Sequence, residues 1–432
     1  MLEYNETEPK RKKRFVMRKN LKPVIIINIL ILALLLTSCI PRSITVPNHN
    51  SVSGETQIPS PAPESTPNVL PEPTPEPTPV PTPEPTPVPT PEPDPIQTVI
   101  DGMTDEELIG QMVMCGFSGT DEPSAEFISL MQEYKLGNII LFGQNTENFG
   151  QTKALIDRIK EKNPSDIPLS FSIDVEGGSV RRFSWKPALF SAKTLGNKND
   201  PALTEEQFLR IGTELMNIGI TIDLAPVLDI AHDPSETFLA KRMFGSDPEK
   251  TVPQAVAAVK GLNQSGCVSI GKHFPGHGNT ATDSHESVPV IKSSYEKWAE
   301  YDLTMFRAAV ESGIGGMLVG HISYPKIDPD HIASVSKIFI TDILRGELGF
   351  KGMVLSDDMR MQAIAGTVGI GEGSVQFIEA GGDMVLIGKG IERQKTVFHA
   401  LRDALSEGRL SRERLEESVY RILVMKNYPA AG

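Results

Sequence analysis

The chain has 432 residues and a net charge of −13, with 55 acidic and 42 basic side chains. Its first 38 residues carry a net charge of +5, so the remainder carries −18, which argues against nucleic acid as a partner. Three cysteines cannot make a disulfide framework, and we expect Cys115 and Cys267, in apolar runs, to be buried thiols.

The N-terminal segment predicts export with a lipid anchor. A basic run at 10–14 precedes an apolar stretch at 24–36, which fits a signal peptide and is short for a membrane-spanning helix. The stretch ends in Leu36-Thr37-Ser38-Cys39, which resembles a bacterial lipobox, so residues 1–38 are the predicted signal peptide and Cys39 the lipidation site. Met17 is an alternative start, and a short transmembrane anchor is the competing interpretation. We expect an extracytoplasmic protein that meets the cell membrane only through its lipid.

Residues 39–96 form a predicted disordered linker rich in proline, threonine and glutamate. Between 59 and 95 proline occupies nearly every second position, which favours polyproline II over a packed core. At about 3.1 Å per residue, the linker reaches on the order of 150 Å from the anchor.

Residues 97–432 predict a single α/β domain, a TIM-like (β/α)8 barrel. Short apolar runs alternate with amphipathic stretches, as is typical of parallel βα units. The predicted strands are 112–117, 138–142, 169–173, 221–225, 268–271, 316–319, 353–355 and 383–387. The predicted helices are 205–216, 252–264, 295–310, 392–406 and 412–425, with one more that begins late, near Ser374, after a glycine-rich stretch.

In such a barrel the active site lies at the C-terminal ends of the strands. The third predicted strand ends in Asp174-Val175-Glu176-Gly177-Gly178, followed by Arg181 and Arg182. A carboxylate before paired glycines offers an acceptor for the hydroxyl groups of a ligand, although an ordinary turn with a capping aspartate would look similar.

The fifth predicted strand leads into Lys272-His273-Phe274-Pro275-Gly276-His277-Gly278 and then Asp283-Ser284-His285. Neighbouring strand residues face opposite ways, so Lys272 and His273 can both line a pocket only if the strand ends there. Asp283 and His285 are two positions apart and share a face in an extended segment. The carboxylate would fix the imidazole tautomer and favour its protonated form, which suits a general acid.

Two other interpretations of this stretch remain. It could be a loop of ordinary hydrogen-bonded histidines, or His273, His277, Asp283 and His285 could be metal ligands. The spacing lacks a helical histidine pair, and Lys272 would repel a cation, so we expect no metal.

The seventh predicted strand ends in Ser356-Asp357-Asp358. Two carboxylates after an apolar strand are costly unless they are used or paired. We expect Asp357 to point into the barrel mouth and Asp358 to turn toward neighbouring loops.

Together these segments resemble glycoside hydrolase family 3, in its bacterial β-N-acetylhexosaminidase branch. The long signature is Lys272 to Gly278 with Asp283 to His285, and Asp174 to Phe183 and Ser356 to Asp358 match further elements. Ala225 to Asp229 and Arg242-Met243-Phe244-Gly245 match two more. Val175 departs from the glutamine usual in the branch.

The resemblance implies a TIM-like barrel, with Asp357 as nucleophile, His285 as acid/base and Asp283 orienting it. It also implies that N-acetylglucosamine is held by Asp174, Arg182, Arg242, Lys272 and His273.

The expected function is that of a retaining β-N-acetylhexosaminidase acting on peptidoglycan fragments or related glycans, as a monomer with no cofactor. A phosphorylase of the same family is one alternative, because a neutral histidine tolerates an incoming phosphate better than a carboxylate does. A β-glucosidase of the same family is another. A non-catalytic wall-binding lipoprotein is the alternative from another class. We also expect the loop from Gly276 to Asp283 to move during turnover.

Overall fold

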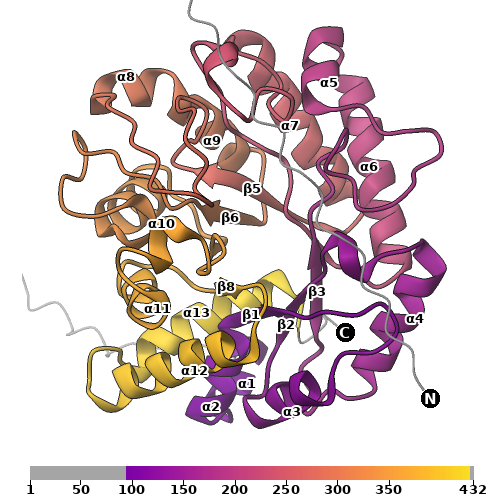
Figure 1. The fold of residues 1–432 in the computed structure, drawn as a ribbon, viewed down its shortest axis with the longest axis vertical. Helices are drawn as coiled ribbons and strands as arrows, with labels where there is room; N and C mark the ends of the chain where they lie inside the picture. The colour runs from indigo at the N-terminus through magenta and orange to yellow at the C-terminus, as the bar shows by residue number, and fades with distance from the viewer. Residues whose placement is uncertain (1–93, 429–432) are drawn as a thin grey trace, which may run out of the picture. The chain divides into compact units, whose positions relative to one another are not determined.

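The computed structural model describes residues 94–428. The predicted signal peptide, Cys39 and nearly all of the predicted linker lie outside the described residues. Within them, eight parallel strands are surrounded by helices (Figure 1). No helix among the described residues is long and apolar enough to span a membrane.

The strands form one sheet in the order β7-β6-β5-β4-β3-β2-β1-β8. Their bounds are β1 Val113–Gly116, β2 Asn138–Ile140, β3 Ser170–Ile173, β4 Ile222–Asp223, β5 Val268–Phe274, β6 Gly316–Val319, β7 Met353–Ser356 and β8 Val385–Ile387. A parallel bridge between Leu355 of β7 and Met384, the residue before β8, brings the two ends of the sheet together. The predicted (β/α)8 barrel is therefore confirmed.

Two helices precede β1, and the others follow the strands and cover the outside of the barrel. Those before β5 are α1 Pro95–Asp101, α2 Asp105–Gln111, α3 Ala125–Glu133, α4 Phe149–Lys160, α5 Ala192–Lys198, α6 Pro201–Asn217 and α7 Pro248–Gln264. After β5 come α8 Tyr295–Glu300, α9 Asp302–Glu311, the π-helix η4 Ile338–Glu347, α10 Gln362–Ala365, α11 Ile370–Glu379, α12 Ile391–Ser406 and α13 Arg412–Met425. Short 3₁₀ turns lie at Gly143–Asn145, Pro234–Glu236 and Ala333–Val335.

Helices α6 and α7 begin earlier than the sequence predicted. The first residue of each helix is a proline, which lacks the N–H group that would have no partner within the helix at that position. An aspartate precedes it as the N-cap. The Asp200 side chain accepts hydrogen bonds from the Ala202 and Leu203 amides, and the Asp247 side chain accepts one from the Glu249 amide.

Two other helix predictions were wrong in their bounds. The predicted helix 295–310 is broken at Tyr301, whose hydroxyl donates to the Ala231 carbonyl, into α8 and α9. Helix α11 begins at Ile370, four residues before Ser374, and includes two glycines. At Gly373 a Cβ atom would come within 2.9 Å of Ile364, so close packing against α10 explains the small residue.

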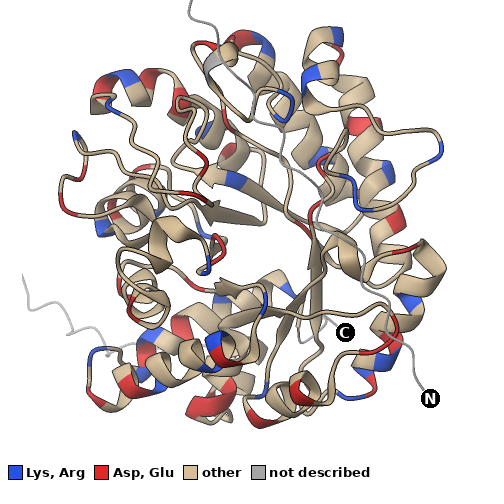
Figure 2. Ribbon diagram, viewed as in Figure 1, with Lys and Arg blue, Asp and Glu red and all other residues tan. Residues whose placement is uncertain are grey.

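The apolar faces of the strands and helices form one continuous core. All described residues of β1, β3, β6 and β7 are buried, which matches a parallel sheet covered on both faces. Cys115 and Cys267 are buried free thiols, as predicted. Figure 2 shows charged residues over the outer helices and at the ends of strands, whereas the strands themselves are mostly uncharged.

Candidate active site

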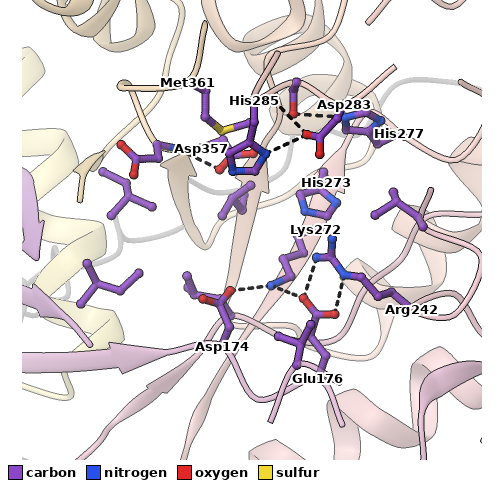
Figure 3. A pocket seen from close by; sticks show the side chains of 18 of the residues that line it. Asp174, Glu176, Arg242, Lys272, His273, His277, Asp283, His285, Asp357 and Met361 are labelled. Carbon is purple, nitrogen blue, oxygen red and sulfur yellow. Dashed lines mark hydrogen bonds and ion pairs between the residues drawn. The ribbon is translucent and has the colours of Figure 1, made fainter. Parts of the chain in front are cut away.

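The loops at the C-terminal ends of the strands enclose a cavity of about 330 Å³. This volume is at the low end of the range for small-molecule sites, roughly 300–1,000 Å³. Every predicted catalytic and substrate-binding residue lines it, and Figure 3 shows most of them. These residues are Asp174, Arg182, Arg242, Lys272, His273, Asp283, His285 and Asp357.

A charged network forms one wall of the cavity. The Lys272 Nζ atom, from the end of β5, lies 2.7 Å from Asp174 Oδ1 and 2.8 Å from Glu176 Oε1, both from the segment after β3. Arg242 binds Glu176 through two bonds of 2.7 Å, and Arg182 Nη2 lies 2.8 Å from Asp174 Oδ2. Each carboxylate is thus shared by two cations.

The network fixes the charge states of its members. Burial raises the pKa of Asp174, but the adjacent Lys272 and Arg182 charges outweigh it and hold the pKa well below its ordinary value. Burial likewise opposes ionisation of Glu176, and Lys272 and Arg242 lower its pKa overall. The two carboxylates in turn raise the pKa of Lys272 against the effect of its burial. All three groups are therefore ionised at neutral pH.

A buried aspartate holds the two histidines of the signature loop. Asp229 Oδ2 lies 2.6 Å from His273 Nδ1, and Asp229 Oδ1 accepts a 2.6 Å bond from the His277 amide. Burial raises the pKa of Asp229, but the neighbouring His273 charge and hydrogen bond lower it overall. With Nδ1 of His273 committed to Asp229, its Nε2 atom is left for a ligand.

The predicted acid/base pair is formed and exposed. His285 Nδ1 lies 2.7 Å from Asp283 Oδ1, which also accepts the His285 amide hydrogen at 3.0 Å. The His285 side chain is 73% exposed. Between the two residues, Ser284 Oγ lies 3.3 Å from His277 Nε2, so the buried histidine contacts the segment that carries the pair.

Asp357 follows β7 directly and lines the same cavity as His285. Its amide donates to the Val319 carbonyl at the end of β6, and its Oδ1 accepts from the Asp358 amide. Asp358 pairs with Arg360, and its Oδ1 accepts a hydrogen bond from the Gly388 amide after β8. The side chain therefore turns toward neighbouring loops, as predicted. It nevertheless also lines the cavity.

The expectation that the fifth strand ends before Lys272 was wrong. Strand β5 continues to Phe274, and its register against β6 shifts between Gly271 and Phe274. Lys272 and His273 both line the cavity because this irregularity interrupts the regular alternation of side chains.

Sequence reasoning gave no role to Glu176, Asp229 or Phe238. Glu176 stands in the quoted segment after the third strand, and a second carboxylate two positions after Asp174 is a signal that it shares the same face. Asp229 lies in the segment after β4, as Asp174 lies after β3, although it stands six positions beyond the end of its strand. Phe238 lies in a loop whose sequence carries no comparable pattern.

Within residues 94–428, no group of three or more His, Cys, Asp or Glu side chains is arranged to hold a metal ion.

Comparisons with known proteins agree with this geometry. The model of the glycosyl hydrolase family 3 N terminal domain matches residues 103–425. A beta-hexosaminidase from Nitrosomonas eutropha (strain DSM 101675 / C91 / Nm57) is 33% identical over 319 residues, covering 71% of this chain and 90% of that protein.

Two solved structures show the same likeness. A glycoside hydrolase family 3 beta-N-acetylglucosaminidase from Paenibacillus sp. str. FPU-7 is 36% identical with a TM-score of 0.74, covering 77% of this chain and 64% of that one. A beta-glucoside phosphorylase is 25% identical with a TM-score of 0.69, and the match covers 77% of this chain and 60% of that one. The chain therefore spans less than two thirds of both structures.

The family model covers about three quarters of the chain, and the N. eutropha protein is matched over nearly its whole length. The barrel is the fold that the resemblance implied, with the quoted motifs gathered at one rim. The chain belongs to glycosyl hydrolase family 3 and is a glycoside hydrolase.

Proposed function

We propose that the chain is a retaining β-N-acetylhexosaminidase that removes terminal β-linked N-acetylglucosamine. One observation carries the proposal: Asp357 and the Asp283–His285 pair, which stand more than seventy positions apart, line one cavity whose far wall is a buried charged network. The similarity to proteins named beta-hexosaminidase and beta-N-acetylglucosaminidase supports this choice of substrate.

In the first proposed step, the Asp357 carboxylate attacks the anomeric carbon and forms an ester to it. The bond from that carbon to the leaving oxygen breaks, and protonated His285 gives its proton to that oxygen. In the second step, His285 takes a proton from water, the water oxygen bonds to the anomeric carbon, and the ester to Asp357 breaks. Asp283 orients the His285 ring throughout, through the bond at Nδ1.

The sugar's hydroxyl groups are proposed to bind Asp174, Arg182, Arg242, Lys272 and His273. The charged side chains are already held by one another, so a sugar meets donors and acceptors in fixed positions. No cofactor takes part in this scheme.

The remaining parts of the proposal concern where and on what the enzyme acts. We propose that it works outside the cytoplasm as a monomer, tethered through Cys39, and that its substrates are peptidoglycan fragments or related glycans. The signal-like segment and the proline-rich composition before residue 94 support this location.

The proposal is tested by assaying p-nitrophenyl β-N-acetylglucosaminide against the corresponding glucoside. We expect turnover of the first, release of the β-anomer first in an NMR time course, and a loss of at least about 10³-fold in Asp357→Ala. Asp166→Asn, a change at an exposed aspartate outside the cavity, is the control. Sugar binding without any hydrolysis would instead indicate a non-catalytic wall-binding protein, and first release of the α-anomer would contradict a retaining mechanism.

A phosphorylase is the second candidate, favoured by the likeness to the beta-glucoside phosphorylase. The proposed acid/base is an imidazole, which repels an incoming phosphate less than a carboxylate would. Adding phosphate to the same assay separates the two, because a phosphorylase releases the sugar 1-phosphate whereas a hydrolase releases the free sugar.

A further inference from the structure

We infer that Phe238 forms a platform for the leaving part of the substrate, and that this part is a second pyranose ring. The inference rests on the proposed function and names the residue that recognises the leaving group. Phe238 lies in the loop between β4 and α7 and lines the same cavity as Asp357 and His285.

The exposure of Phe238 is not explained by the fold. Its side chain is 42% exposed, whereas its neighbours Thr237 and Leu239 are buried. The Leu239 amide donates to Thr237 Oγ, and the Leu239 carbonyl accepts the Arg242 amide, so the loop is fixed on both sides of Phe238. Burying a phenylalanine side chain contributes about 1.5–3 kcal/mol, and the part of this ring that the protein leaves open at the cavity can be covered by a ligand.

The ring lies on the side of the cavity where the leaving group must be. Phe238 contacts His277 edge to face, with ring centroids 5.1 Å apart and an interplanar angle of 82°. His277 Nε2 in turn lies 3.3 Å from Ser284 Oγ, next to His285. Because His285 is the proposed donor of the proton to the leaving oxygen, the leaving group lies beside this cluster.

The opposite side of the cavity is built for the sugar that is cleaved off. Figure 3 shows His277, Asp283 and His285 on one side, and Asp174 and Glu176 with Lys272 on the other. The His285 side chain is 73% exposed, so the bond that it protonates lies near the mouth of the cavity, and the leaving ring sits there.

The chemistry of the platform selects a pyranose ring. One face of a β-linked pyranose presents C–H groups, which pack against an aromatic ring, while its hydroxyls stay in water at the exposed mouth. An anionic leaving group would not be attracted to the ring face, which carries the negative part of the aromatic quadrupole.

The experiment compares two glycosyl donors, meaning substrates that transfer N-acetylglucosamine to the enzyme. The leaving group of one is a second sugar ring, and that of the other is not. The first is the β-1,4-linked disaccharide of N-acetylglucosamine, and the second is β-N-acetylglucosaminyl fluoride. In Phe238→Ala we expect kcat/KM to fall about fivefold to tenfold on the disaccharide and to change less than about twofold on the fluoride. Phe238→Trp should keep the activity on both.

Phe190→Ala is the matched control. Phe190 is 39% exposed but does not line the cavity, and both of its hydrogen bonds to Gln207 come from its backbone. In Phe190→Ala, kcat/KM should stay unchanged on both the disaccharide and the fluoride. An equal loss on both donors in Phe238→Ala, or no loss on either, would overturn the platform while the proposed function stands. A wild-type protein that cleaves neither donor would overturn the proposed function, and the platform with it.

Discussion

His273 Nδ1 lies 2.6 Å from Asp229 Oδ2 in the floor of the cavity, nearly the same distance that joins His285 to Asp283 at its mouth. The two pairs differ in their surroundings, because the first is buried and the His285 side chain is 73% exposed. A buried pair is held in one position by its neighbours, whereas an exposed pair can swing with its loop. The first therefore suits a fixed binding role and the second a proton donor that must approach and withdraw.

Replacing His285 should separate substrates by their leaving groups. In His285→Ala we expect a loss of about 10²–10⁴-fold in kcat/KM on the disaccharide and much less on p-nitrophenyl β-N-acetylglucosaminide, whose leaving group needs little protonation. Parallel kinetics on the two substrates check this. His331→Ala is the control, since His331 also contacts an aspartate, Asp328, but lies outside the cavity. Equal losses on both substrates would contradict the role of His285 as acid.

The shared carboxylate Glu176 should matter more than an equally well-bonded surface glutamate. Glu176→Gln leaves Arg242 and Lys272 with an incomplete set of partners in a buried site, which we expect to lower stability by about 3–5 kcal/mol and kcat/KM by at least about 10²-fold. Chemical denaturation and steady-state kinetics measure the two effects.

Glu372→Gln is the control for Glu176→Gln. Glu372 also accepts two bonds from one arginine, Arg409, but on the surface, where such pairs contribute about 0–1 kcal/mol. Similar losses in both variants would show that burial of the pair is not what matters.

Asp302 should make stability depend on pH. Burial raises its pKa to about 8, and Asn279 donates to its Oδ1 at 2.8 Å. The pKa of Asp302 is higher in the folded state than in the unfolded state, so the folded state keeps a proton that the unfolded state releases. The free energy of unfolding therefore falls as pH rises from the unfolded-state pKa toward the folded-state pKa of about 8.

Asp302→Asn should therefore gain in Tm relative to wild type as pH increases from 5 to 8. The upper limit is about 1.4 kcal/mol per pH unit, and thermal unfolding across this range measures it. Asp166→Asn, on the exposed surface, should show no such trend. A constant difference between Asp302→Asn and wild type at every pH would disprove the effect.

Gly278 should tolerate no side chain. A Cβ atom there would collide with the Ile230 carbonyl, so Gly278→Ala must displace the loop that leads to Asp283 and His285. We expect a loss of about 1–3 kcal/mol in the free energy of unfolding, together with reduced activity. Gly102→Ala is the control, because its nearest neighbour, the Val99 carbonyl oxygen, would be 3.5 Å from the new Cβ. Unchanged stability in Gly278→Ala would show that the loop can yield.

The barrel was predictable because its signal is local. Alternating apolar runs and amphipathic stretches specify βα units, and parallel units in this number close into a barrel. The residues at which individual helices begin and end were less predictable. At the break, the Tyr301 hydroxyl reaches the Ala231 carbonyl seventy positions away. In α11, Gly373 packs too closely against Ile364 for a larger side chain.

By itself the sequence determined that Asp174, Lys272, His273 and Asp357 would lie at strand ends, and a closed parallel barrel brings all such ends to one rim. Only the tertiary structure decided which of these groups pair. Lys272 and Asp174 are 98 positions apart, and Arg242 and Glu176 are 66 apart. Contacts of this kind depend on strand register, loop path and burial, which are properties of the packed chain. For the same reason the exposure of Phe238 at the cavity could not be predicted from the residues around it.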